Sequence, residues 1–268
     1  PIKKGEIMTF TGHTILITGG TSGIGLGFAK KFSELGNKVI ITARNEKRLH
    51  QILNENPTFT GFVSDVADKD SLPQLVNFIK ENFPQLDVIM NCAGIMRAIN
   101  LFEQADNSLE VLTEEIHINL LGTIAVTQAF LNTLVANDGL VINVSSGLSN
   151  LADGAHPIYN LTKAGVHFYS DALREQAKYF EKTLKVIELV PPLVAETNLE
   201  SHTNTDAPNN MALSDLISET LAGLENGLDR IDAGFAKQLH QMGKVNSDEN
   251  TQLLSQQMLT TYFPKMKD

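Results

Sequence analysis

Cysteine and tryptophan are almost missing from this sequence, which has one cysteine, Cys92, and no tryptophan in 268 residues. A single thiol excludes any disulfide within the chain, which fits a reducing compartment. Residues 1–10 lack the apolar core of a secretory signal peptide. No apolar run approaches the roughly 18 residues that a bilayer span requires, so we expect no membrane segment. We therefore expect a cytoplasmic protein.

Positive charge is scarce as well. The chain has 21 Lys and Arg against 31 Asp and Glu, which gives a formal net charge of -10. Binding to nucleic acid or to an anionic membrane surface depends on clustered cations. We therefore expect neither partner, and the negative charge is typical of a soluble protein.

Internal repeats and Pro/Gly-rich linkers are absent, which predicts a single domain over 8–268. Short apolar, β-branched runs alternate with longer amphipathic stretches, and runs that are apolar on both faces are typical of a buried parallel sheet. The alternation predicts a Rossmann-like, doubly wound α/β fold of about seven strands with helices on both faces. We expect strands at 14–18, 38–43, 58–63, 87–91, 140–145, 185–190 and, weakly, 228–235.

The expected helices are 23–35, 46–54, 71–82, 109–136, 159–180, 213–225 and a short one at 252–260. The segment 191–228 changes character, with prolines and polar residues before its helix, and we interpret it as a substrate loop and helix. The remainder, 236–268, is interpreted as a polar, Gln-rich C-terminal tail.

Three glycines, Gly19, Gly23 and Gly25, stand between the first expected strand and the first expected helix. Glycine permits a positive φ and lets a pyrophosphate approach the backbone, and a helix N-terminus attracts anions. The alternative is an ordinary tight turn. The strand–turn–helix context favours a dinucleotide site, and we expect cofactor contacts from all three glycines and from Thr21, Ser22 and Ile24.

The second expected strand ends in Ala43 and Arg44. Dinucleotide folds that prefer NAD place a carboxylate at this strand end to bind the ribose hydroxyls. A guanidinium instead suits the 2′-phosphate of NADP. We therefore expect NADP(H) to be preferred over NAD(H), the alternative for Arg44 being a solvated strand-end residue.

Further polar and small residues follow the next two strands. Asp65 can accept a hydrogen bond from an adenine amino group or simply serve a turn. Small residues at the end of the fourth strand let it lie against a cofactor, whereas Cys92 is expected only to pack as a small apolar side chain. The expected contacts here are Asp65, Val66, Asn91, Ala93 and Gly94.

Tyr159 and Lys163 are four residues apart and therefore share one face of the expected helix. At about 4 Å and an effective dielectric of about 20, an ammonium is worth roughly 4 kcal/mol to a phenolate. That amounts to about 3 pKa units, enough to bring a phenol towards neutral pH. Ser146 follows the fifth strand, and Asn119 lies within a helix where asparagine is a poor residue. The alternative is an exposed helical pair with no catalytic role.

From residue 14 to about 194, these motifs resemble the short-chain dehydrogenase/reductase family in its single-domain branch. The resemblance implies a catalytic tetrad of Asn119, Ser146, Tyr159 and Lys163. Ser146 would orient a substrate carbonyl, Tyr159 would pass the proton and Lys163 would hold the cofactor ribose. Asn119 would anchor a water of the proton relay. The detail is most similar to bacterial oxidoreductases encoded near D-alanyl-lipoteichoic acid genes.

The same resemblance implies cofactor contacts from Pro191, Val194 and Thr197, and assembly into a homodimer or homotetramer. The chain departs from the family at Pro192, where members usually have glycine. It also has Glu196 where members place a nicotinamide-contacting threonine. Either the loop holds one extra residue or Pro192 sets the register.

The expected activity is NADP(H)-dependent hydride transfer on a small carbonyl or alcohol substrate. Two alternatives remain open: an NAD(H)-dependent alcohol dehydrogenase, and a dinucleotide-binding sensor or scaffold with little turnover. A hydrolase is disfavoured because Ser146 lacks the glycine pattern of a nucleophile elbow. The histidines show no metal-ligand spacing with cysteine or carboxylates, so no metal is expected.

Overall fold

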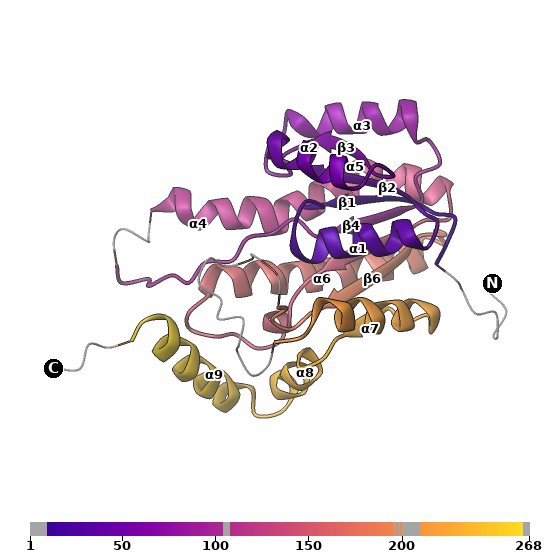
Figure 1. The fold of residues 1–268 in the computed structure, drawn as a ribbon. Coiled ribbons are helices and arrows are strands. Elements are labelled where there is room, and N and C mark those ends of the chain that lie inside the picture. Colours follow the sequence, from indigo (N-terminus) through magenta and orange to yellow (C-terminus); the bar gives the residue numbers. More distant parts are fainter. Residues whose placement is uncertain (1–9, 104–107, 196, 198, 200–209, 265–268) are drawn as a thin grey trace.

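Seven parallel strands form one sheet in the computed structural model, in the order β3-β2-β1-β4-β5-β6-β7 (Figure 1). The structure describes residues 10–103, 108–195, 197, 199 and 210–264. This is the doubly wound, Rossmann-like fold that the sequence predicts. The strands are β1 (Thr14–Thr18), β2 (Lys38–Ala43), β3 (Thr60–Val63), β4 (Val88–Asn91), β5 (Leu140–Val144), β6 (Lys185–Val190) and β7 (Arg230–Asp232).

Strands β1, β4 and β5 are buried along their whole length, which is why they are apolar on both faces. Strand β1 pairs with β2 on one side and with β4 on the other. The chain order therefore reverses between β1 and β4. In open α/β sheets a ligand binds beyond the carboxyl ends of the strands at such a reversal.

Helices cover both faces of the sheet. One apolar cluster contains buried residues of α1, α2 and α7, and the other contains those of α3, α5 and α6. Two further helices, α8 and α9, lie beyond these layers at the lower edge of Figure 1. The helices are α1 (Gly23–Glu34), α2 (Glu46–Glu55), α3 (Ser71–Asn82), α4 (Leu109–Ile116), α5 (Gly122–Ala136), α6 (Pro157–Tyr179), α7 (Leu213–Glu225), α8 (Ala236–Lys244) and α9 (Ser247–Tyr262).

The expected helix over 109–136 is interrupted by a π-helical turn, His117–Leu121, between α4 and α5. By length and composition alone, Leu109–Ala136 is apolar enough to cross a membrane. Its residues Val126, Phe130 and Leu134 are instead buried in the apolar cluster shared with α3 and α6. The stretch therefore has the packing of a core helix.

The C-terminal region differs from the expectation of a polar tail with one short helix at 252–260. Residues 236–244 form α8, whose Ala236 and Leu239 are buried, and α9 runs from 247 to 262. The pattern was missed because α8 has only two buried positions in nine residues and α9 has none. Of the expected loop 191–228, residues 196, 198 and 200–209 lie outside the described part of the chain.

Candidate active site

The turn after β1 brings the glycine motif against the end of β4. Thr18 Oγ1 accepts hydrogen bonds from the backbone N–H groups of Cys92 and Ala93, both at 3.2 Å. Gly19 has a φ of 67°, and a Cβ there would lie 2.9 Å from the Ala93 Cα. A Cβ on Gly25 would lie 2.5 Å from the Gly19 carbonyl oxygen. Larger residues would force this turn apart, so glycine is required at both positions.

Helix α1 begins at this turn with its N-terminus directed to a cavity. Ser22, the N-cap residue, has an extended backbone, and its side chain makes no capping hydrogen bond. Ser22, Gly23 and Ile24 line the cavity, together with Gly19 and Gly25. Uncapped N–H groups and the positive end of the helix dipole form an anion site. The residues present therefore fit a dinucleotide pyrophosphate.

Pro191, Val194 and Thr197 also line this cavity. Val194 is held by a β-bridge to Met211. Thr197 donates a hydrogen bond to the Val194 carbonyl oxygen at 2.8 Å, and its side chain lies 3.3 Å from where a Cβ on Gly23 would be. The structure thus brings Thr197 to the glycine turn, whereas Glu196 lies outside the described residues.

Arg44 extends from the end of β2 and is exposed over 58% of its side chain. Its Nη1 lies 3.6 Å from Glu114 Oε1, a distance typical of a weak surface ion pair. Glu114 is bound more closely by Arg97, and this hydrogen bond holds the pKa of the Glu114 carboxyl below its ordinary value. Arg44 is therefore available to exchange Glu114 for an anionic ligand.

Five of the expected cofactor contacts lie outside the residues that line the cavity. Asp65 Oδ1 accepts a hydrogen bond from the Ala67 N–H, as a turn carboxylate does. Asn91, the last residue of β4, is buried and donates hydrogen bonds from Nδ2 to Thr127 Oγ1 and Asn143 Oδ1. The cofactor roles of this group stay predictions; its members are Thr21, Arg44, Asp65, Val66 and Asn91. Ala93 and Gly94 do line the cavity.

Tyr159 and Lys163 lie side by side near the start of α6, which begins at Pro157. Both are buried, with at most 5% of each residue exposed, and both line the cavity. Lys163 Nζ lies 5.6 Å from the centroid of the Tyr159 ring and donates a hydrogen bond to the Val144 carbonyl oxygen at 2.9 Å. The pair is therefore internal and not an exposed helical pair.

Ser146 follows β5 and lines the cavity beside them. Its backbone is extended, and its Oγ accepts a hydrogen bond from the Leu148 N–H at 3.2 Å as it caps a short 3-10 turn. The hydroxyl hydrogen is thus left to point elsewhere. A serine held in this way can donate to a carbonyl oxygen in the cavity.

Asn119 is fully buried in the π-helical turn between α4 and α5. Its Oδ1 accepts from the Ile95 N–H and its Nδ2 donates to the Ile95 carbonyl oxygen, both at 2.8 Å. Nδ2 also donates to Thr162 Oγ1 on α6 at 3.2 Å. The π-turn therefore aims Asn119 at the segment after β4 and at the helix that carries Tyr159. Such turns occur frequently at functional sites.

Burial lowers the pKa of Lys163 to about 8, although the Cys92 and Glu115 acidic groups oppose that change. The ammonium is therefore the main form at neutral pH and is lost in mildly alkaline solution. Burial raises the pKa of the Cys92 thiol to about 12, so Cys92 remains a neutral thiol, as its interpretation as a packing residue requires.

Glu115, which sequence reasoning missed, is fully buried one turn before Asn119. Its Oε1 accepts a hydrogen bond from the Arg97 N–H, whereas Oε2 has no hydrogen-bond partner among the described residues. Burial raises the pKa of this carboxyl to about 7, although the hydrogen bond from the Arg97 N–H and the nearby positive charges act in the opposite direction. The only signal in the sequence for a place of Glu115 near the site is its spacing of four residues, about one helical turn, from Asn119.

Helices α8 and α9, also missed as site elements, complete the far wall of the cavity. The cavity has a volume of about 420 Å³ and extends from the glycine turn to these helices. Their contribution to its lining is apolar except for Gln257 and the hydroxyl of Tyr262; the other residues are Leu239, Met242, Leu253, Leu254 and Met258.

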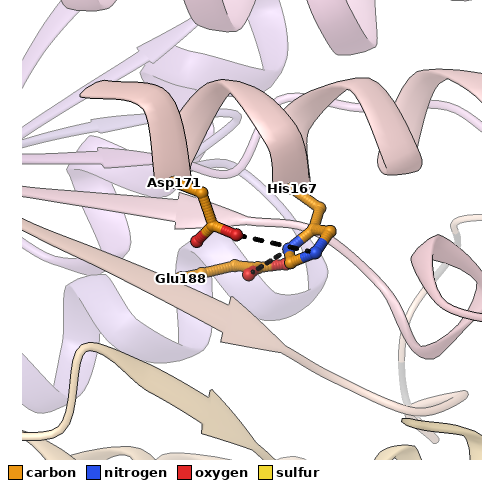
Figure 2. A group of neighbouring side chains, drawn as sticks. All are labelled: His167, Asp171 and Glu188. Atoms are coloured by element: carbon orange, nitrogen blue, oxygen red, sulfur yellow. Dashed lines mark hydrogen bonds and ion pairs between the residues drawn. The ribbon is translucent and has the colours of Figure 1, made fainter. Parts of the chain in front are cut away.

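A separate cluster lies between α6 and β6, where His167, Asp171 and Glu188 direct their polar atoms toward one another (Figure 2). Such a group can hold a metal ion. Here, however, Arg230 Nη1 lies 2.9 Å from Glu188 Oε2 and 2.8 Å from His167 Nδ1. A cation would stand against this guanidinium, so the cluster is an ion-pair network.

A sequence profile of the family described as short chain dehydrogenase matches residues 13–208. The Uncharacterized oxidoreductase DltE of Bacillus subtilis (strain 168) is 36% identical over 188 residues, which cover 70% of this chain and 73% of that protein. These matches confirm the resemblance found in the motifs.

Two solved structures share the fold. A short chain dehydrogenase from Burkholderia cenocepacia J2315, in complex with NADP, has a TM-score of 0.79 at 22% identity and covers 92% of this chain and 99% of its own. A short chain dehydrogenase/reductase from Burkholderia phymatum, in complex with NAD, has a TM-score of 0.72 at 17% identity and covers 83% and 89%. At these identities the likeness concerns the fold alone.

Proposed function

The chain belongs to the short chain dehydrogenase family, and from this premise we propose that it is an NADP(H)-dependent oxidoreductase acting on a small carbonyl or alcohol substrate. One observation carries the proposal. Tyr159 and Lys163 are buried in the wall of the cavity that also receives the glycine turn and the uncapped N-terminus of α1.

In the reductive direction the Tyr159 hydroxyl donates its proton to the carbonyl oxygen of the substrate, and in the oxidative direction the phenolate takes the proton back. The ammonium of Lys163 stabilises that phenolate. Ser146 donates a hydrogen bond to the same substrate oxygen and so polarises the carbonyl. When bound, the nicotinamide cofactor supplies or accepts the hydride.

Asn119 supports this machinery through its bonds to Ile95 and Thr162, which join the segment after β4 to α6. The residues that would hold the cofactor are the glycines of the turn, Lys163 at the ribose and Thr197 at the nicotinamide end. Arg44 and the neutral side chain of Ala43 favour NADP(H) over NAD(H), because a guanidinium pairs with a 2′-phosphate.

The test of the proposal is the Tyr159→Phe variant, assayed with a panel of aldehydes and ketones by the loss of NADPH absorbance. Wild type should oxidise NADPH, whereas the variant should lose turnover by a factor of at least about 10² and bind NADPH unchanged. Turnover that survives in the variant would refute the assignment of Tyr159 as the acid.

Homo-oligomeric assembly and a cytoplasmic location also stay proposals. Support for assembly comes from large apolar side chains exposed on one helix, namely Leu161 and Phe168 of α6. Light scattering on wild type and on Phe168→Glu tests the assembly, since a charge in an interface core should favour the monomer.

A further inference from the structure

Helix α9 places one side of its surface against the cavity. Leu254, Met258 and Tyr262 recur every four residues, so they lie on one face of the helix, and all three line the cavity. None of them is buried, and α9 as a whole contains no buried residue. Their apolar surface therefore borders open space in the cavity.

Contacts at both ends hold α9 in this position. Near its start, Asn250 Nδ2 donates hydrogen bonds to the carbonyl oxygens of Met242 and Val245, at 2.9 and 2.8 Å. At its end, the Tyr262 ring meets the His156 ring edge-on, with centroids 4.7 Å apart. Between them, a Cβ on Gly154 would lie 2.9 Å from Leu259 Cδ1. The helix is thus fixed across the cavity as a wall.

Positive charge is scarce around this wall. Among the described residues that line the cavity, Lys163 is the sole cation, and its ammonium belongs to the acid/base pair. The described residues 210–229 and 245–264, which contribute Asn210 and the α9 side chains to the lining, contain no Lys or Arg. A carboxylate or phosphate on the substrate would therefore find no partner there.

Among the described residues that line the cavity, Asp153 is the one carboxylate, and it already has hydrogen-bond partners. Its Oδ1 accepts hydrogen bonds from the N–H groups of Ala155 and His156 at 2.8 Å, and its Oδ2 lies 3.0 Å from the His156 ring. Asp153 is therefore a poor partner for a cationic or sugar-like substrate.

We propose that the substrate of this oxidoreductase is an uncharged aldehyde or ketone with an extended apolar substituent, which lies along Leu254 and Met258 of α9. The proposal rests on the proposed function and names its substrate class. The carbonyl lies at Tyr159 and Ser146, and the apolar substituent extends from there to the wall of α9.

The experiment compares straight-chain aldehydes from propanal to decanal with aldehydes of matching length that end in a carboxylate, at fixed NADPH. For the uncharged series, kcat/KM should rise about fourfold with each added methylene until the cavity is filled. The carboxylate-bearing series should be turned over at least about tenfold less well at equal length. A flat response to length, or a preference for the carboxylates, would overturn the proposal.

Two matched variants test the place of the substituent. Leu254→Lys puts a cation on the cavity face of α9, and Gln256→Lys puts the same cation on an exposed position outside the lining. Leu254→Lys should make kcat/KM depend less on the length of the uncharged aldehydes and should raise kcat/KM for the carboxylate-bearing aldehydes. Both effects should come from changes in KM. Gln256→Lys should leave both series as in wild type. Equal effects of the two variants would remove α9 from the substrate site.

A binding arm separates failure of this inference from failure of the proposed function. Straight-chain primary amides of increasing length, titrated calorimetrically into the NADPH-saturated protein, report on the cavity without turnover. Tighter binding with length, combined with no turnover of any carbonyl, would uphold the apolar site and overturn the oxidoreductase. Turnover of carbonyl substrates, with no effect of chain length on either turnover or binding, would uphold the oxidoreductase and overturn the apolar substrate site.

Discussion

Glu115 offers a quantitative test of the electrostatics behind this site. Burial raises its pKa to about 7 from an ordinary 4.5, so the folded protein favours the neutral carboxyl. Below pH 4.5 both states are protonated and the group contributes nothing. As pH rises towards 7, the unfolded chain ionises first, and the free energy of unfolding falls; above 7 the loss is complete. At about 1.4 kcal/mol per pKa unit, the loss reaches about 3 kcal/mol.

The perturbation is Glu115→Gln, which retains an oxygen acceptor for the Arg97 N–H but cannot ionise. We expect urea unfolding, followed by circular dichroism at pH 5, 6, 7 and 8, to show that the free energy of unfolding of the variant increases relative to that of wild type as pH rises. The total increase should be about 3 kcal/mol. Glu114→Gln is the matched control, because Glu114 is only partly buried and its pKa is lowered. The stability difference between that variant and wild type should stay constant from pH 5 to 8, because the Glu114 carboxyl is ionised in both the folded and the unfolded state over this range. A constant difference between wild type and Glu115→Gln across this pH range would refute the reasoning.

Three further tests address other parts of the molecule. Arg44→Ala should weaken NADPH binding about 10- to 100-fold in a fluorescence titration and leave NADH binding unchanged; equal losses for both cofactors would contradict the 2′-phosphate assignment. Because the pKa of Lys163 is about 8, the affinity of the cofactor-free protein for NADPH should fall as pH rises from 7 to 9; a flat titration curve would show that its charge is not needed. Arg230→Met should lower the free energy of unfolding by about 3–5 kcal/mol, because it leaves Glu188 buried without its guanidinium. Adding Glu188→Gln should restore part of that loss, and a second substitution that costs as much again would contradict the pairing.

The strands and most helices were predictable because burial on both faces of a parallel sheet leaves a short apolar run in the sequence. Tyr159, Lys163 and the three glycines were predictable because four-residue spacing and the strand–turn–helix order translate directly into proximity. All five residues line the same cavity, as that proximity requires, and their chemical roles stay predictions.

Other features depend on tertiary contacts and leave little local signal. The raised pKa of Glu115 results from burial, which no spacing encodes. The network of His167, Glu188 and Arg230 joins α6, β6 and β7, whose residues are far apart in the chain. The sequence of α9 predicted a polar tail because only a few of its positions are apolar. The contribution of those positions to the cavity depends on where the fold places the helix.

The position of α9 also separates two tasks along the chain. Tyr159 and Lys163, to which we assign the proton transfer, lie near the start of the 23-residue helix α6, where Lys163 is bonded to the end of β5 in the layered core. Under our substrate proposal, the surface that selects the molecule lies in a helix outside those layers, beyond residue 208 where the family profile ends. Replacement of that last segment should therefore change which compounds are accepted while the chemistry of the reaction stays the same.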